Sequence, residues 1–220
     1  MSSTIARKLY LAVLVAVLAM LAAVLILGKL PIGVKYGLAS ERLPGSDTNG
    51  LDIVEAARRQ IGVTVVYDSS YRTMPYPNGD IPRDRGVCSD VVIRALRDAR
   101  GMDLQKLVHE DMAANFMSYP SLTRWMMFKT DANIDHRRVL NLERFFGRSG
   151  WSLEITQNAA DYLPGDIVTC LIGGDVPHVM IVSDRKSQAG RLLVIHNVGA
   201  GTEEEDCLFD YEITGHHRLR

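Results

Sequence analysis

Hydrophobic periodicity divides residues 51–220 into a helical first half and a strand-rich second half. Helical spacing of apolar residues predicts helices over 51–60, 88–100, about 104–117 and about 137–146. From Trp151 onward the apolar runs are short and β-rich, and turn residues such as Pro164-Gly165 separate them. These runs predict strands over 151–156, 166–172, 178–184, 191–198 and 208–214. Helices followed by strands indicate an α+β domain, with N-terminal helices packed on a C-terminal antiparallel sheet.

The N-terminal segment indicates export. Leu9–Gly28 is a 20-residue run without a charged side chain, which is the length that a helix needs to cross a bilayer. Arg7 and Lys8 precede this run, so the positive-inside rule predicts one transmembrane helix with the following body outside the cytoplasm. A cleaved signal peptide is the alternative, although its apolar region is usually shorter, roughly 7–15 residues.

Three regions follow from this reading. We expect a signal anchor or signal peptide over residues 1–30, a Pro- and Gly-rich linker over 31–50, and one domain over 51–220. The expected location is the cell membrane with a periplasmic or extracellular body, or the periplasm after cleavage. Three of the 25 basic residues and none of the 26 acidic residues lie in the first 30 positions, which leaves the remainder with a net charge of −4. This mildly acidic body has no basic signature for nucleic acid.

Three side chains suggest covalent catalysis. Cys88 lies where the loop Arg85-Gly86-Val87 turns into a predicted helix, and the partial positive charge of a helix N-terminus can stabilise a thiolate and an oxyanion. His178 begins a predicted strand and is the candidate base. His196 lies on the next strand, where it could orient the His178 ring.

Other interpretations of these residues stay open. A cysteine at a helix start can be a small buried hydrophobe, and a histidine on a strand can be a satisfied core residue. Cys88, His178 and His196 could be zinc ligands, although no Cys-x-x-Cys or His-x-x-x-His pair supports a metal site. Cys170 and Cys207 could form a disulfide, which would leave Cys88 free. We expect no cofactor.

The order of these motifs resembles the NlpC-type papain-like cell-wall peptidases. The resemblance rests on Pro164-Gly165-Asp166-Ile167-Val168, His178-Val179-Met180-Ile181-Val182 and Ile195-His196. It implies that Cys88 is the nucleophile, His178 the base and His196 the third member of the site. Val87-Cys88-Ser89-Asp90 departs from the usual Asp-Cys-Ser-Gly of that superfamily. The resemblance implies hydrolysis of an amide or peptide bond, with peptidoglycan stem peptides as the substrate that the compartment supplies.

A closer resemblance joins the chain to a family of exported bacterial proteins, domain of unknown function 1287. The similar phrases are Tyr76-Pro77-Asn78-Gly79-Asp80, Gly86-Val87-Cys88, Asp103-Leu104-Gln105, Ile134-Asp135-His136-Arg137-Arg138, His196-Asn197 and Gly215-His216-His217-Arg218. They cover nearly the whole body. This family brings no established activity beyond the one inferred from the NlpC-like core.

Further polar residues are candidates for substrate binding. They are Tyr67, Tyr76, Asp90 and Asn197. Asp135–Arg138 could clamp a substrate carboxylate, or could be a helix cap on a solvated face. His216–Arg218 is expected to be a surface end. Two other functions remain possible: an acyl transferase or thioesterase on the same fold, and a non-catalytic cell-wall binding or scaffold protein. The sequence does not indicate an oligomeric state.

Overall fold

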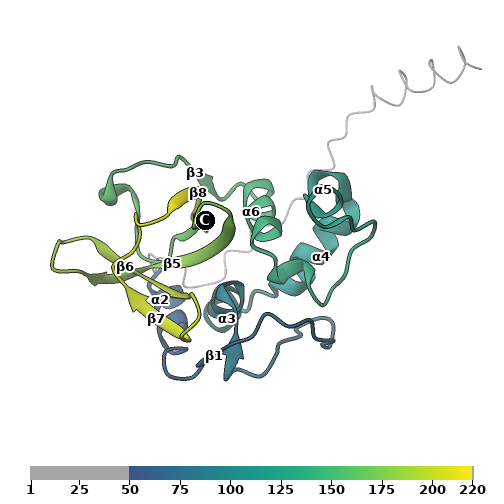
Figure 1. The fold of residues 1–220 in the computed structure, drawn as a ribbon, viewed down its shortest axis with the longest axis horizontal. Coiled ribbons are helices and arrows are strands. Elements are labelled where there is room, and N and C mark those ends of the chain that lie inside the picture. The colour runs from purple at the N-terminus through teal and green to yellow at the C-terminus, as the bar shows by residue number, and fades with distance from the viewer. Residues whose placement is uncertain (1–49, 220) are drawn as a thin grey trace, which may run out of the picture. The chain divides into compact units, whose positions relative to one another are not determined.

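The computed structural model describes residues 50–219 and contains a curved antiparallel sheet with helices against one face (Figure 1). The α-helices are α2 (Leu51–Arg58), α3 (Cys88–Arg100), α4 (Leu104–Ala114), α5 (Ser121–Trp125) and α6 (Val139–Arg148). Short 3₁₀ turns occur at η1 (Phe116–Ser118), η2 (Asp135–Arg137) and η3 (Ala159–Asp161). The predicted α+β class, with helices on an antiparallel sheet, is confirmed.

The strands of the main sheet are not arranged in the order in which they occur in the sequence. Its strands are β3 (Ser152–Leu153), β4 (Ile167–Ile172), β5 (Val176–Lys186), β6 (Leu192–Asn197), β7 (Thr202–Glu205) and β8 (Glu212–His217). They lie in the order β3-β8-β4-β5-β6-β7, so β8 lies between β3 and β4. A separate parallel pair joins β1 (Val66–Tyr67) to β2 (Arg85–Gly86), directly before α3.

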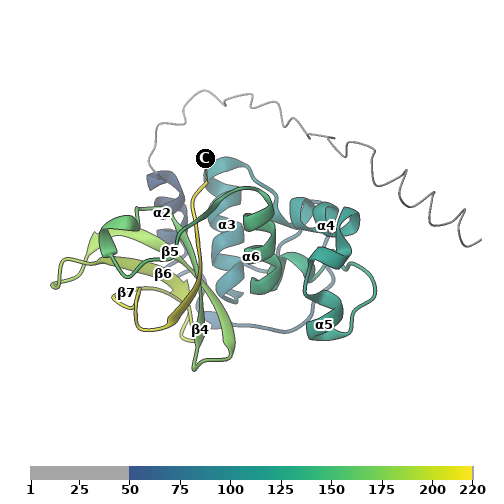
Figure 2. The ribbon, with the colours of Figure 1, turned by 90° about the horizontal axis from the view of Figure 1, so that it is seen from above.

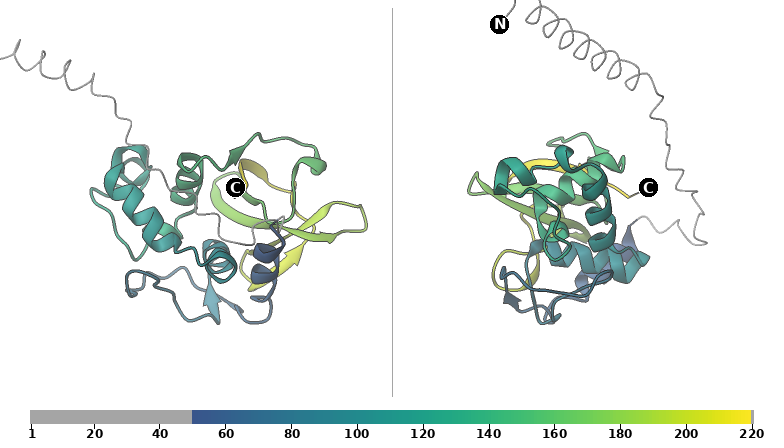
Figure 3. Two further views of the ribbon diagram at one scale, coloured as in Figure 1. Left: turned by 180° about the vertical axis from the view of Figure 1, so that it is seen from behind. Right: turned by 90° about the vertical axis from the view of Figure 1, so that its right-hand side faces the viewer.

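Helices α3 and α6 stand beside the sheet, and α4 and α5 lie on their far side (Figure 2). The views from behind and from the side show α2 next to α3, where both contact β5 (Figure 3). This arrangement buries α3 on nearly all sides, and every residue from Cys88 to Leu96 is buried.

Two apolar clusters occupy opposite faces of the sheet. Residues of α3, α4 and α6 pack with Val179 and Ile181 on the helical side. Met180 and Val182, which alternate with them along β5, pack with Cys170 and Val194 in a second cluster. Because successive side chains of a strand point to opposite faces, this alternation also fixes the side of the sheet to which each polar residue of β5 belongs.

Several predicted boundaries differ from the structure. The helix predicted over about 104–117 ends at Ala114, and Gly147 lies inside α6 instead of ending it. The strand predicted over 208–214 is displaced along the chain, because residues 208–211 form the turn before β8, which spans Glu212–His217. Strand β7 was missed because its sequence, Thr-Glu-Glu-Glu, has no apolar alternation.

The predicted anchor and linker at residues 1–30 and 31–49 lie outside the described residues. Within residues 50–219, no helix combines the length and apolar character needed to cross a membrane.

Candidate functional site

Cys88 is the first residue of α3, as the sequence predicts. The turn before it is fixed by Asp90, whose carboxylate accepts a hydrogen bond from the backbone N–H of Val87 at 2.7 Å. The same carboxylate forms a bidentate pair with Arg137, with both N–O distances at 2.9 Å. Both side chains are buried. Asp90 is therefore part of the support of the Cys88 turn.

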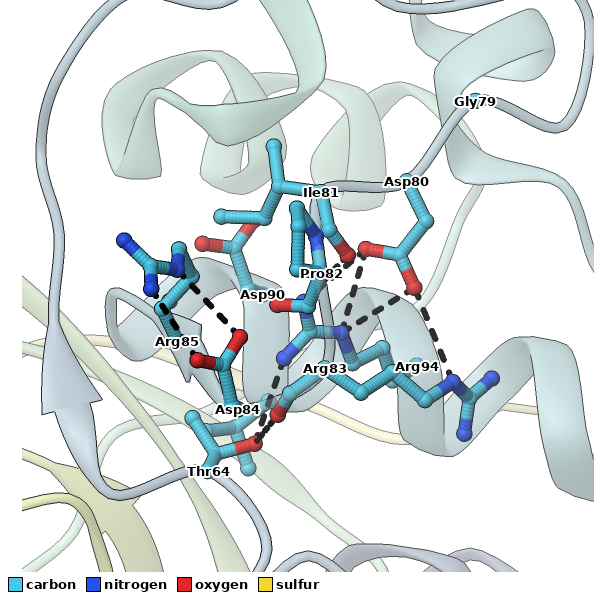
Figure 4. Close-up of polar contacts among 12 residues, drawn as sticks. Thr64, Gly79, Asp80, Ile81, Pro82, Arg83, Asp84, Arg85, Asp90 and Arg94 are labelled. Carbon is cyan, nitrogen blue, oxygen red and sulfur yellow. Dashed lines mark hydrogen bonds and ion pairs between the residues drawn. The ribbon is translucent and has the colours of Figure 1, made fainter.

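The loop that leads to Cys88 is held by a second arginine, Arg94, one helical turn further along α3 (Figure 4). Its guanidinium is fully buried and binds both oxygens of Asp80 at 3.0–3.1 Å. It also donates to the carbonyl of Ile81 at 3.2 Å and to the hydroxyl of Thr64 at 3.2 Å. These contacts attach residues 80–82 to the helix that carries Cys88.

His178 and His196 lie on neighbouring strands, and their rings form one end of a hydrogen-bonded chain. His178 Nε2 lies 2.9 Å from His196 Nδ1. His196 Nε2 lies 2.8 Å from Glu205 Oε2, on β7. Both histidines are buried, whereas the side chain of Glu205 is 47% exposed. Sequence reasoning missed Glu205, because a run of three glutamates has the pattern of a solvated face.

The chain of contacts fixes the protons on both rings. An ionised carboxylate only accepts hydrogen bonds, so His196 carries its proton on Nε2 and accepts at Nδ1. His178 must then donate from Nε2, which leaves a lone pair on Nδ1. That nitrogen has no hydrogen-bond partner among residues 50–219 and is not one of the fully buried unpartnered atoms. His178 is therefore held as a neutral imidazole whose Nδ1 lone pair has no hydrogen-bond partner among residues 50–219.

Cys88 contacts β5 beside His178, not at the imidazole. The sulfur lies against the backbone N–H of Val179, within the cluster on the helical side of the sheet. His178 pairs across the sheet with Cys170 and so shares the other side of β5 with Met180. Within the described part of the chain, no hydrogen bond joins Cys88 to either histidine. The structure brings the two histidines together and leaves the thiol unpaired with them.

Burial governs the charge of both groups. It raises the pKa of the Cys88 thiol to about 11, outweighing the N–H groups of Val179, Ser89 and Cys88 that act in the opposite direction. It also lowers the pKa of His178 to about 3, with a smaller contribution from His196. The sequence predicts a thiol pKa lowered by the helix N-terminus, but in this structure desolvation is the larger effect. The resting site therefore contains a neutral thiol and a neutral imidazole.

A cavity of about 230 Å³ opens beside Cys88. Its lining residues are Tyr67, Ser69, Val87, Cys88, Trp125, Ile134, Arg137, Arg138, Val139, Leu140 and Pro177. The lining contains two arginines and no acidic side chain. At roughly 30 Å³ per water molecule, the volume corresponds to about seven or eight waters.

The other sequence candidates have different positions. Tyr67 lines the cavity, whereas Tyr76 packs against the ring of His109 and is not among the lining residues. Asn197 donates to the carbonyl of Gly86 at 3.1 Å and so joins β6 to the turn before Cys88. The solvated face proposed for Asp135–Arg138 is wrong for its first three residues, which are buried.

The predicted surface end at His216–Arg218 is also wrong. His216 and His217 are buried in β8. Asp166, from the Pro-Gly-Asp motif, accepts hydrogen bonds from His216 Nε2 and Arg218 at 2.6–2.7 Å. The motif therefore joins the start of β4 to the end of β8.

The three cysteines are free and buried, so Cys170 and Cys207 do not form the disulfide that was considered. Among the described residues, His196, Glu205 and Cys207 place ligand atoms within 4.8 Å of one another and could hold a metal ion. However, both nitrogens of His196 already have hydrogen-bond partners. Burial also raises the pKa of the Cys207 thiol to about 12, which keeps its proton on. The observed contacts are those of a hydrogen-bonded chain.

Two comparisons with known proteins match most of the described residues. The model of a family described as a domain of unknown function, DUF1287, matches residues 54–219. The chain is also 51% identical over 173 residues to the uncharacterized protein YijF of Escherichia coli (strain K12). This alignment covers 79% of this chain and 82% of that protein. The match spans Cys88, His178, His196 and Glu205, and the chain belongs to the DUF1287 family.

Proposed function

We propose that the chain is an exported cysteine hydrolase of the NlpC-like type, with Cys88 as nucleophile, His178 as base and His196 as the residue that orients it. The observation that carries the proposal is the chain from His178 through His196 to Glu205, because it leaves His178 Nδ1 unprotonated. A base of this kind lies one residue from the backbone N–H that contacts the Cys88 sulfur. Catalytic contacts can form only when substrate binds, and here the mechanism requires a rearrangement, because Cys88 and His178 lie on opposite sides of β5 in the structure.

In this mechanism, substrate binding brings the thiol and Nδ1 together. His178 accepts the thiol proton while Sγ attacks the carbonyl carbon, and the N–H groups at the start of α3 stabilise the oxyanion. The imidazolium then protonates the leaving amine as the C–N bond breaks, which gives a thioester. Water adds to the thioester with His178 as base, which releases the carboxylic acid and restores the thiol.

The proposed substrate is a peptide or amide of the cell envelope, most specifically the stem peptide of peptidoglycan. Its support is the charge pattern of the N-terminus: Arg7 and Lys8 before the uncharged run Leu9–Gly28 favour an exported body near the wall. A reporter that is active only outside the cytoplasm, fused after Arg220, tests this location. Inactivity of that fusion, with activity of a cytoplasm-only reporter, would contradict it.

A non-catalytic cell-wall binding protein is the second candidate. It is favoured by the protonated resting state of Cys88 and by the missing hydrogen bond between Cys88 and His178. An acyl transferase or thioesterase would use the same residues on another acyl substrate, and no contact among residues 50–219 distinguishes it from a hydrolase.

Turnover of purified muropeptides by single variants separates these functions. Cys88→Ser should abolish turnover, because a hydroxyl is much less nucleophilic than a thiol, while the melting temperature stays near that of the wild type. His178→Ala should be nearly as damaging, and His196→Ala milder because nucleophile and base remain. Cys170→Ala and Cys207→Ala are the matched controls, and they should cost stability but not activity. If Cys88→Ser turned over muropeptides as fast as the wild type, the proposal that Cys88 is the nucleophile of a hydrolase would be wrong. If neither the wild type nor any variant turned over muropeptides, the binding protein would be favoured.

A further inference from the structure

Two arginines line the cavity beside Cys88, and they differ in the number of hydrogen-bond and ion-pair partners of their guanidinium groups. Arg137 already has a counter-charge: it pairs with Asp90 and also donates to the carbonyls of Ser70 and Asp68 at 3.1 Å. Arg138, the next residue, has no carboxylate within ion-pair distance among residues 50–219. Its guanidinium donates only to the sulfur of Met127, a weak acceptor, and lies 4.2 Å over the ring of Trp125.

The unpaired charge of Arg138 lies in the same cavity as the Cys88 thiol. Arg138 directly precedes α6, and it lines the same cavity as Cys88, the first residue of α3. A half-buried guanidinium without a counter-charge loses hydration and gains little in return. Consistent with this, burial lowers the pKa of Arg138, and the attraction of Asp135 and Asp131 offsets that effect only in part. An incoming anion would restore the missing partner.

We propose that Arg138 is a specificity-determining residue that binds a carboxylate of the substrate, next to the carbonyl that Cys88 attacks. The inference rests on the proposed function and narrows its substrate class to acidic peptides or amides. A guanidinium pairs with a carboxylate through two parallel hydrogen bonds, and Trp125 keeps the guanidinium oriented by stacking on one face. One free guanidinium matches one carboxylate charge. No acidic side chain lines the cavity, so none would lie in direct contact with a carboxylate bound there.

The test compares two alkylating reagents of similar size and different charge at Cys88. Iodoacetate carries the carboxylate and iodoacetamide does not, and each forms an Sγ–CH₂ bond with loss of iodide and of the thiol proton. Peptide mass spectrometry gives the rate at Cys88 for each reagent, and the same cysteine in the urea-unfolded chain gives the intrinsic ratio. In the folded wild type, the ratio of iodoacetate to iodoacetamide rates should exceed the intrinsic ratio.

Arg138→Gln should lower this ratio by about tenfold or more, the lower end of the change expected when one hydrogen bond to a charged group is lost. Arg138→Lys, which retains the charge, should keep part of the preference. The matched control is Arg124→Gln, on α5, because Arg124 is exposed and is not part of the cavity lining. An unchanged ratio in Arg138→Gln would overturn the proposal, as would a folded wild type whose ratio equals that of the unfolded chain.

A second readout separates failure of this inference from failure of the hydrolase. Wild type and Arg138→Gln are assayed on a wall peptide with a free carboxylate and on the same peptide with that carboxylate amidated. Arg138→Gln should lose activity on the free acid and keep it on the amide, mainly through KM. Equal losses on both peptides would contradict carboxylate recognition. Absence of any turnover, together with the expected alkylation ratios, would reject the hydrolase and leave the anion site supported.

Discussion

At the residue scale, two effects act on the Cys88 thiol in opposite directions. The start of α3 provides N–H groups that favour the thiolate, and the enclosing core disfavours it by removing water. Desolvation is the larger effect, so the pKa of the thiol rises to about 11. The resting site therefore holds no thiolate–imidazolium pair, and the mechanism proposed above would form the thiolate only during the reaction.

The raised pKa gives a prediction for alkylation of the folded protein. The rate of reaction of Cys88 with neutral iodoacetamide should rise roughly tenfold per pH unit from pH 6 to pH 9, because the thiolate fraction does so below the pKa. The rate is followed by mass spectrometry of the peptide that contains Cys88, with Cys88→Ala to confirm the assignment. A plateau across this range would show that a stable thiolate–imidazolium pair exists, contrary to the structure.

At the element scale, the start of α3 depends on a buried ion pair from a distant segment. Asp90 accepts from the Val87 N–H and pairs with Arg137, which follows 47 residues later in the chain. Arg137 in turn holds the carbonyls of Asp68 and Ser70. The pair therefore connects η2, the loop after β1 and the turn that carries Cys88.

We expect Asp90→Asn to lower the free energy of unfolding by about 3–5 kcal/mol, because it leaves Arg137 buried without a counter-charge. The double variant Asp90→Leu/Arg137→Met should lose less than the sum of the two single changes, since it leaves no charge unpaired. Urea denaturation measures both. As a matched control, the surface pair Glu55–Arg59, with side chains 73% and 55% exposed, should tolerate Glu55→Gln with little change. Additive losses at Asp90 and Arg137 would show that the two charges are not coupled.

The sequence predicted those elements whose ends carry their own signals. Helix α3 was predicted at its observed bounds because Gly86 precedes it and Gly101 adopts the left-handed C-cap conformation, with φ of +63°. Strand β8 was misplaced, because its apolar neighbours form a turn and its histidines are buried only through pairing with β4 and Asp166. The local pattern of apolar and polar residues does not show which distant strand a segment will pair with. The position of Cys88 at the start of α3 and of the two histidines on neighbouring strands had local signals in the sequence, whereas the contact of His196 with Glu205 depends on strand pairing and was missed.

At the scale of the whole molecule, buried histidines make stability depend on pH. Burial lowers the pKa of His178 to about 3, and burial lowers those of His136 and His217 to about 4. In the unfolded chain the pKa of each histidine is about 6.5. At a pH between the folded and unfolded values, the unfolded chain therefore binds protons that the folded chain does not bind. This contribution to stability is complete above about pH 6.5 and is lost as the pH falls toward the folded pKa values.

The free energy of unfolding should therefore fall between pH 6.5 and pH 5, by up to about 1.4 kcal/mol per pH unit for each of these histidines. His136→Gln should make the slope shallower, and a second change, His217→Gln, should reduce it further. Urea denaturation at several pH values gives the slopes. The prediction fails if stability rises on acidification, or if removal of both histidines leaves the slope unchanged.

The place of β8 in the sheet has a consequence for the order in which the domain can be completed. This strand is made after all the other strands of the sheet, yet it occupies an interior position between β3 and β4. A chain still emerging from the ribosome therefore cannot close the sheet, whatever its earlier segments have formed. Loss of residues 212–217 would remove the connection between β3 and β4 instead of shortening an edge. The six-stranded sheet can therefore be completed only after residues 212–217 have been synthesised, whatever part of it β4–β7 have already formed.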